Sequence, residues 1–248
     1  GHLHAEKVPL QKIAKEVGTP FYCYSSSMIK NNFTEFARAV SVLGAEICYA
    51  IKANSNIAII KILADLGAGA DVVSVGEFKR AMIAGIPANK IIFSGVGKTT
   101  EDLKFALLEG VNQINIESEV ELVSLSKLAV SLGLVANIAL RINPDVDAKT
   151  HEKINTGRAE NKFGIDIDLA KKVFFRAKKL PGIKVSGIAV HIGSQLLSLT
   201  PFRKAYKKVL EFVQDLGDEG KSIVNLDLGG GLGICYDKET PLSPQSFS

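Results

Sequence analysis

Lys52 stands where an amine could act as a nucleophile, directly after the apolar run Tyr49-Ala50-Ile51. A buried strand of this kind delivers its last side chain to the edge of a sheet or the mouth of a barrel. We expect partial desolvation there to lower the pKa of the amine and leave it nucleophilic, as Schiff-base chemistry requires. The competing interpretation is a surface lysine, which is the commoner role of this residue.

His191 and Arg141 end two later strand-like runs. An imidazole in that position would face the same space as Lys52, although a lone histidine on an apolar strand is more often a core residue. Arg141 adds a cation. Because a buried arginine without a partner is costly, we expect an anionic group beside it.

Three consecutive glycines, Gly229-Gly230-Gly231, follow the last strand-like run. Glycine exposes backbone amides that can form an anion-binding nest, and barrels often hold a phosphate on the loops after strands seven and eight. A tight turn would explain the triplet equally well. Combined with Lys52, however, the triplet indicates a site for a phosphorylated aldehyde.

Two further segments resemble known functional motifs, but each lacks a required residue. Gly95-Val96-Gly97-Lys98-Thr99 resembles a nucleotide-binding loop, but the required first glycine is replaced by Ile92. His151-Glu152 could begin a zinc-protease motif, but Asn155 stands where the second histidine is needed. We therefore expect no metal site and no nucleotide hydrolysis.

These residues need a scaffold, and the apolar pattern alternates between strand-like and helix-like segments. The strand-like runs are short and apolar on both faces, which is typical of a parallel sheet covered on both sides. They span 47–51, 70–75, 91–95, 113–117, 137–142, 185–192 and 223–228. The helix-like segments span 56–66, 76–84, 100–109, 118–132, 167–179 and 201–216.

Residues that typically end or begin helices flank these segments and support the division. Four of them are followed by a glycine, the residue that most easily adopts the left-handed conformation that ends a helix. These glycines are Gly67, Gly85, Gly110 and Gly133. At the other end, Ser118 and Glu121 have the spacing of a capping box, which satisfies two amides at a helix start.

Regular alternation of strands and helices predicts an α/β fold with a parallel sheet, either open or closed into a barrel. An open sheet that binds a dinucleotide should carry a glycine-rich loop after its first strand, yet residues 52–56 contain no glycine. A TIM-type (β/α)8 barrel is therefore favoured. Seven strands are one short of closure. Either one strand is missed, or the chain stops before the eighth, and we favour truncation after the seventh.

Composition excludes several classes of protein. The chain has 248 residues, 46% of them apolar, and a net charge of +4 with basic residues scattered among acidic ones, which argues against nucleic-acid binding. No apolar run is long enough to cross a membrane, and no signal peptide is recognisable. The three separated cysteines indicate reduced thiols. We expect a cytoplasmic location.

Several motifs together resemble the barrel-type pyridoxal-phosphate-dependent decarboxylases. Their order matches that of the family over nearly the whole chain. They are Tyr49–Asn54, Gly69-Ala70-Asp71, Ser74-x-x-Glu77, Arg141-Ile142-Asn143-Pro144, Thr156-Gly157, Asn161–Gly164, His191–Gln195 and Leu228–Gly231. The 161–164 loop and Gln195 are more similar to the diaminopimelate decarboxylases than to the ornithine or arginine enzymes.

The resemblance implies a role for each site residue. Lys52 would bind pyridoxal 5'-phosphate covalently, and His191 would stack on its ring. The phosphate would be held by Ser194 and the backbone of Gly229, Gly230 and Gly231. Asp71 and Arg141 would line the cofactor pocket. The cofactor would serve as the electron sink while the protein supplies orientation and electrostatics.

The implied reaction is the decarboxylation of meso-diaminopimelate to L-lysine and carbon dioxide, in a homodimer of the full-length protein. Members of the family also have an eighth strand and a β-domain that these residues lack. By the resemblance, residues 1–25 belong with that β-domain and 26–248 with the barrel. We expect this chain alone to bind the cofactor weakly and to decarboxylate poorly.

Other functions remain open from the sequence. The same fold group includes ornithine and arginine decarboxylases and racemases. A single-domain barrel that binds pyridoxal phosphate without catalysis would have about this length. A barrel with no cofactor is a third alternative, which an absent cofactor absorbance would support.

Overall fold

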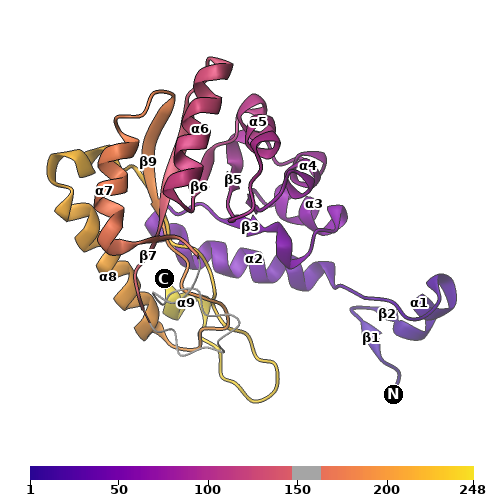
Figure 1. Ribbon diagram of the computed structural model, residues 1–248. Helices are drawn as coiled ribbons and strands as arrows, with labels where there is room; N and C mark the ends of the chain where they lie inside the picture. The colour runs from indigo at the N-terminus through magenta and orange to yellow at the C-terminus, as the bar shows by residue number, and fades with distance from the viewer. Residues whose placement is uncertain (147–162) are drawn as a thin grey trace.

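In a computed structural model, which describes residues 1–146 and 163–248, a seven-stranded parallel sheet organises the chain (Figure 1). Its strand order is β10-β9-β7-β6-β5-β4-β3, and every pairing along it is parallel. The strands are β3 (Cys48–Ala50), β4 (Gly69–Val72), β5 (Ile91–Phe93), β6 (Gln113–Ile116), β7 (Ala136–Asn143), β9 (Ile183–Ala189) and β10 (Asn225–Asp227). Each predicted strand-like run overlaps one of them.

Helices follow most strands and cover the outer face of the sheet (Figure 1). They are α3 (Ile57–Asp65), α4 (Val75–Ile83), α5 (Thr100–Glu109), α6 (Glu119–Leu132), α7 (Ile167–Ala177) and α8 (Leu199–Asp215). All six predicted helical segments are present. Short 3-10 helices lie between elements: η1 (Ser41–Leu43), η2 (Ile51–Ala53), η3 (Ala88–Lys90) and η4 (Gly217–Ser222).

The prediction of an α/β barrel-type fold with seven strands in this chain is confirmed. In the part of the chain that the structure describes, no strand joins β10 to β3, so these two strands are the edges of the curved sheet. A short additional strand, β8 (Ile165–Asp166), extends the pairing at the carboxyl end of β7 and was not predicted. The described residues include no helix that is long and apolar enough to cross a bilayer.

The hydrophobic core fills the space between the sheet and the helices. Branched residues that point outward from the strands, such as Ile91 and Ile114, are fully buried against helix residues such as Leu122. Aromatic rings pack in the same layer, where Phe78 of α4 meets Phe93 of β5 edge to face at 6.4 Å between ring centroids. Strands that are buried on both sides therefore explain the continuous apolar runs in the sequence.

No helices or strands were predicted for the N-terminal region. It comprises β1 (His4–Ala5), β2 (Val8–Pro9), α1 (Leu10–Val17) and α2 (Ser26–Val40), with the C-terminal α9 (Pro244–Phe247) packed on α2. Helix α1 buries no residue, and Figure 1 shows β1, β2 and α1 standing apart from the sheet. The Glu6 carboxylate joins this arm to the start of α2, where it accepts hydrogen bonds from the Ser25 hydroxyl (2.8 Å) and the Ser27 amide (2.9 Å).

The predicted glycine ends of the helices are confirmed, whereas the predicted capping box at Ser118 and Glu121 is only partly present. The four glycines predicted to end helices all have positive φ, from 67° at Gly133 to 100° at Gly85. The capping-box prediction was correct for the Ser118 side chain and wrong for the Glu121 side chain. The Ser118 hydroxyl accepts from the Glu121 amide as predicted, but the Glu121 carboxylate accepts from the amide of Glu117 instead of Ser118. The carboxylate reaches one residue further back because it also pairs with Lys98.

Replacing Phe78 with alanine tests the core. Its side chain is fully buried, so we expect the free energy of unfolding to fall by about 3–5 kcal/mol. Ile83 on the same helix is 69% exposed and provides the control, because its replacement with alanine should cost less than about 1 kcal/mol. Urea unfolding midpoints would measure both. Equal losses for the two variants would contradict the packing described here.

Candidate functional site

Four ionisable side chains gather at the carboxyl end of the sheet. Lys52 lies in η2 just after β3, Asp71 in β4, Arg141 in β7, and His191 two residues after β9. Their mutual influence shows that they are neighbours. Burial raises the pKa of Asp71 to about 6, against the opposing effects of the Ser94 hydrogen bond and the positive charges of Lys52 and Arg141. Four predicted site residues from four βα units thus lie within electrostatic range of one another at the same end of the sheet.

His191 is held in its neutral form. Burial lowers its pKa to about 4, and the charges of Arg141 and Lys52 add to the effect. The Gly230 amide approaches the Nδ1 atom of the ring at 3.4 Å. A neutral imidazole offers a flat apolar surface, which is suited to stacking against an aromatic ring.

Lys52 departs from the sequence-based expectation in one respect. Its side chain is exposed, so the predicted partial desolvation is wrong for this chain. The physical reason is its position beside β3, which is an edge of the described sheet and has no neighbouring strand on one side. The exposed amine is accessible to a carbonyl compound.

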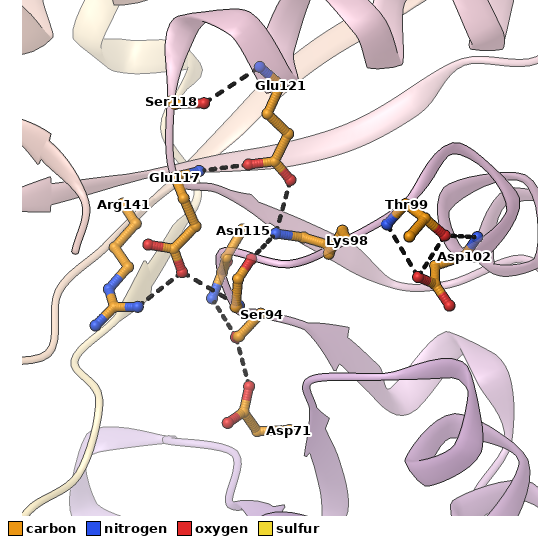
Figure 2. A network of polar contacts seen from close by, with 11 residues as sticks. Asp71, Ser94, Lys98, Thr99, Asp102, Asn115, Glu117, Ser118, Glu121 and Arg141 are labelled. Carbon is orange, nitrogen blue, oxygen red and sulfur yellow. Dashed lines mark hydrogen bonds and ion pairs between the residues drawn. The ribbon is translucent and has the colours of Figure 1, made fainter. Parts of the chain in front are cut away.

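Asp71 belongs to a hydrogen-bonded network that the sequence analysis missed. The Ser94 hydroxyl donates to Asp71 Oδ1 (2.5 Å) and accepts from Asn115 Nδ2 (3.0 Å), as Figure 2 shows. Asn115 Nδ2 also donates to Asp227 Oδ2 (2.8 Å). This network links β4, the residue after β5, β6 and β10. Its signal in the sequence was the presence of polar residues inside strands that are otherwise apolar.

Arg141 has the anionic partner that its burial requires. Its Nη1 atom donates to Glu117 Oε1 at 2.7 Å, and the guanidinium carbon lies 5.5 Å from the centroid of the Phe163 ring. Strand β7 extends to Asn143, so Arg141 lies inside the strand and not at its end. Glu117 follows β6 directly and was also missed by the sequence analysis.

The glycine triplet has a structural explanation for two of its three members. Gly229 has a φ of +68°, and a Cβ there would overlap the Val190 carbonyl oxygen; Gly231 has a φ of +105°, and a Cβ there would overlap the Gly193 carbonyl oxygen. A Cβ on Gly230 would meet nothing within 4 Å. The outer glycines therefore allow close approach to the loop after β9, and the central one leaves its surroundings open.

Gln195 hydrogen-bonds the loop after β9 to the residues that follow the glycine turn (229–231). Its side-chain amide donates to the Ile234 carbonyl (2.5 Å) and accepts from the Ile234 amide (3.0 Å). The Leu196 amide donates to the Gly231 carbonyl beside it (2.8 Å). Ser194, on the same loop, is exposed. The predicted phosphate ligands thus lie on two neighbouring backbone segments.

The residues present fit a phosphorylated aldehyde cofactor. An accessible amine, a neutral imidazole, a guanidinium and a glycine turn with an open central position supply the groups that such a cofactor needs. The described residues contain no group of histidine, cysteine and carboxylate side chains that could hold a metal ion. The motif residues Thr156, Gly157, Asn161 and Lys162, and the discarded His151-Glu152 pair, lie outside the described residues.

The sheet and these groups together define an α/β barrel-type domain with a candidate cofactor site at the carboxyl ends of its strands. Residues 26–247 match the model of the family described as pyridoxal-dependent decarboxylase, pyridoxal binding domain. The chain belongs to this family. Pyridoxal phosphate as the cofactor, predicted from the resemblance, is confirmed at the level of the family.

Individual relatives agree with this assignment. The diaminopimelate decarboxylase of Vibrio cholerae is 48% identical over 248 residues, which are 100% of this chain and 60% of that protein. The crystal structure of diaminopimelate decarboxylase from Helicobacter pylori complexed with L-lysine has a TM-score of 0.92 and 41% identity, covering 96% of this chain and 60% of that one. The arginine decarboxylase of Paramecium bursaria Chlorella virus has a TM-score of 0.81 and 26% identity, covering 96% and 61%. The chain thus spans about 60% of the length of the relatives it matches.

Alanine substitutions can compare Gly231, which has no room for a Cβ, with Gly230, which has open space around it. We expect Gly231→Ala to lower the free energy of unfolding by roughly 2–5 kcal/mol, because the new Cβ is strained by the positive φ and overlaps the Gly193 carbonyl. Gly230→Ala should change it by less than about 1 kcal/mol. Thermal or urea unfolding of both variants would decide the matter, and similar stability of the two would refute the close approach.

The raised pKa of Asp71 makes stability depend on pH. Its pKa is about 6 in the folded chain against an ordinary value of 3.8, so the folded state binds the extra proton between these limits. Relative to Asp71→Asn, the cofactor-free chain should be most stable below pH 3.8 and should lose on the order of 3 kcal/mol as the pH rises through 6. Unfolding midpoints of both chains from pH 4 to 7 would measure this, and a pH-independent difference would count against it.

Proposed function

We propose that the full-length protein containing this chain decarboxylates meso-diaminopimelate to L-lysine and carbon dioxide with pyridoxal phosphate. The observation that carries this proposal is the meeting of Lys52, His191 and Arg141 beside a glycine turn at the carboxyl ends of the strands. The substrate is supported by the relatives: solved structures named diaminopimelate decarboxylase are 38–41% identical to the chain, against 26% for the arginine decarboxylase.

The residues of this chain have separate tasks in the proposal. Lys52 holds the cofactor covalently, and His191 supports the face of its ring. Ser194 and the backbone of Gly229, Gly230 and Gly231 hold the phosphate. Asp71 and Arg141 line the pocket. When bound, the cofactor supplies an electron sink for the bond that breaks at the substrate α-carbon.

The electrostatics of these residues suit that chemistry. A His191 that is neutral above pH 4 adds no positive charge against the ring that it supports. The charge of Arg141 is compensated by Glu117, so the pocket does not carry an unbalanced guanidinium. Arg141 can therefore direct hydrogen bonds toward an anionic ligand while remaining stably buried.

The proposal extends to organisation and location. We place residues 1–25 with a second, β-type domain of the full-length protein and residues 26–248 in the cofactor-binding barrel. The separation of the N-terminal arm from the sheet supports this division (Figure 1). We further propose a cytoplasmic homodimer with a small amino acid as its ligand; the lysine complex of the Helicobacter pylori relative supports the ligand class.

Borohydride reduction tests the central residue. The full-length protein is incubated with pyridoxal phosphate, reduced, digested and analysed by mass spectrometry. We expect the phosphopyridoxyl group on the peptide that contains Lys52, and its loss in Lys52→Ala. Lys61→Ala is the control, because Lys61 is an exposed lysine on the next helix that pairs only with Asp65 among the described residues. An adduct that survives Lys52→Ala would overturn the assignment.

Carbon dioxide release tests the substrate in the same preparation. We expect release from meso-diaminopimelate to exceed release from ornithine and arginine by about a hundredfold or more, because a site that hydrogen-bonds one substrate's polar groups rejects analogues that lack them. Cofactor binding without release from any of the three would favour a non-catalytic binding barrel instead. Faster release from ornithine or arginine would reassign the substrate.

A further inference from the structure

Two neighbouring ion pairs lie at the site, and one of them contains the site residue Arg141. Arg141 pairs with Glu117, and Lys98 pairs with Glu121, each at 2.7 Å (Figure 2). All four side chains are largely withdrawn from solvent: their exposed fractions are 13% for Arg141, 4% for Glu117, 0% for Lys98 and 13% for Glu121. Lys98 belongs to the segment Gly95–Thr99, which lacks the first glycine of a nucleotide-binding loop, and it has no task in the proposed function.

The start of α6 presents both carboxylates. Glu117 is the residue directly after β6, and Glu121 lies in the first turn of the helix. The two are connected, because Glu121 Oε2 accepts a hydrogen bond from the Glu117 amide at 2.8 Å. The Ser118 hydroxyl caps the same turn by accepting from the Glu121 amide. The backbone of Glu117 is therefore fixed by the residue four positions further along the chain.

The loop after β5 holds the other side of Glu117. Gly95 donates its amide to Glu117 Oε1 at 3.1 Å, and its carbonyl accepts from Lys98 Nζ at 2.5 Å. One oxygen of Glu117 thus receives both the Gly95 amide and the Arg141 guanidinium. The loop after β5 and strand β7 therefore meet at a single carboxylate atom.

The second oxygen of Glu117 indicates that this arrangement is not optimised for stability. Oε2 is buried and makes no hydrogen bond within the described residues. A buried carboxylate oxygen without a partner costs free energy, and buried ion pairs contribute little net stability in any case. A retained cost of this kind is commonly associated with a functional position, where geometry matters more than stability.

We infer that Glu117 is a positioning residue, which fixes the guanidinium of Arg141 in the orientation that the cofactor requires. Glu121 accepts a hydrogen bond from the Glu117 amide, and Glu121→Gln retains a side-chain oxygen that can accept it. The inference rests on the proposed function, because it assigns Arg141 to the cofactor pocket. Arg141 acts on the pocket directly, since its charge influences both Asp71 and His191.

Glu121 supplies a matched control. Glu117→Gln and Glu121→Gln each remove one negative charge from the same buried cluster without changing side-chain size. Only the first removes the ion-pair partner of Arg141. A purely structural cluster would respond to both substitutions in the same way.

The experiment measures the affinity of the full-length protein for pyridoxal phosphate by absorbance titration, with urea unfolding midpoints in parallel. We expect Glu117→Gln to weaken binding by about tenfold or more, in line with the usual effect of removing a supporting partner, and Glu121→Gln to change it less than about twofold. Equal affinities for the two variants would overturn the inference. A parent protein that binds no cofactor would instead refute the proposed function.

A double-mutant cycle tests whether Glu117 acts through Arg141. In the Arg141→Met background, Glu117→Gln should cause no further loss of affinity, because its target is already absent. Fully additive losses would contradict the inference. Glu117→Asp is a second variant that retains the charge but shortens the reach, and it should also weaken binding. Affinity equal to that of the parent would contradict the positioning role even if Glu117→Gln did not fold.

Discussion

Removing a charged side chain from water costs on the order of several kcal/mol, and only a well-placed partner offsets that cost. The parallel strands of this sheet all end at the same edge, and charged side chains from several of them meet there. Arg141 is matched with Glu117, Lys98 with Glu121, and Asp71 with the Ser94 hydroxyl. His191, which lies near two positive charges, is neutral. The site is therefore a set of compensated charges, and the choice of polar residues in the neighbouring strands follows from this requirement.

Strand β6 shows how the sheet meets that requirement. Gln113 and Asn115 project to the inner side of the sheet and Glu117 follows them in the same alternation, while Ile114 and Ile116 pack outward among the helices. The inner side chains form a ladder, because Gln113 Nε2 donates to Asn115 Oδ1 at 2.9 Å. Asn115 in turn donates to Ser94 and Asp227. One strand thus connects β10 and the loop after β5 through side chains alone.

The sequence allowed most of the scaffold to be predicted, because buried parallel strands and one-sided helices have strong and different periodicities. Lys52, Arg141, His191 and the glycine turn were also predicted, because each was expected at the end of a strand-like run, and Asp71 was predicted from the family resemblance. Glu117, Asn115 and Asp227 were not predicted. Their roles depend on contacts between residues as many as 112 positions apart, and local patterns contain no information on such pairs. The helix and strands of the N-terminal arm were not predicted, and α1 buries no residue in the described part of the chain.

The fastening of the glycine turn to the loop after β9 has an evolutionary consequence. Gln195 pairs with the Ile234 backbone through its side-chain amide, and Gly231 leaves room for the Gly193 carbonyl. Neither segment can change its path without the other. Substitutions in 191–196 and 229–234 should therefore be accepted during divergence mainly in compatible pairs, so that these two stretches, nearly forty positions apart in the chain, are inherited as one unit.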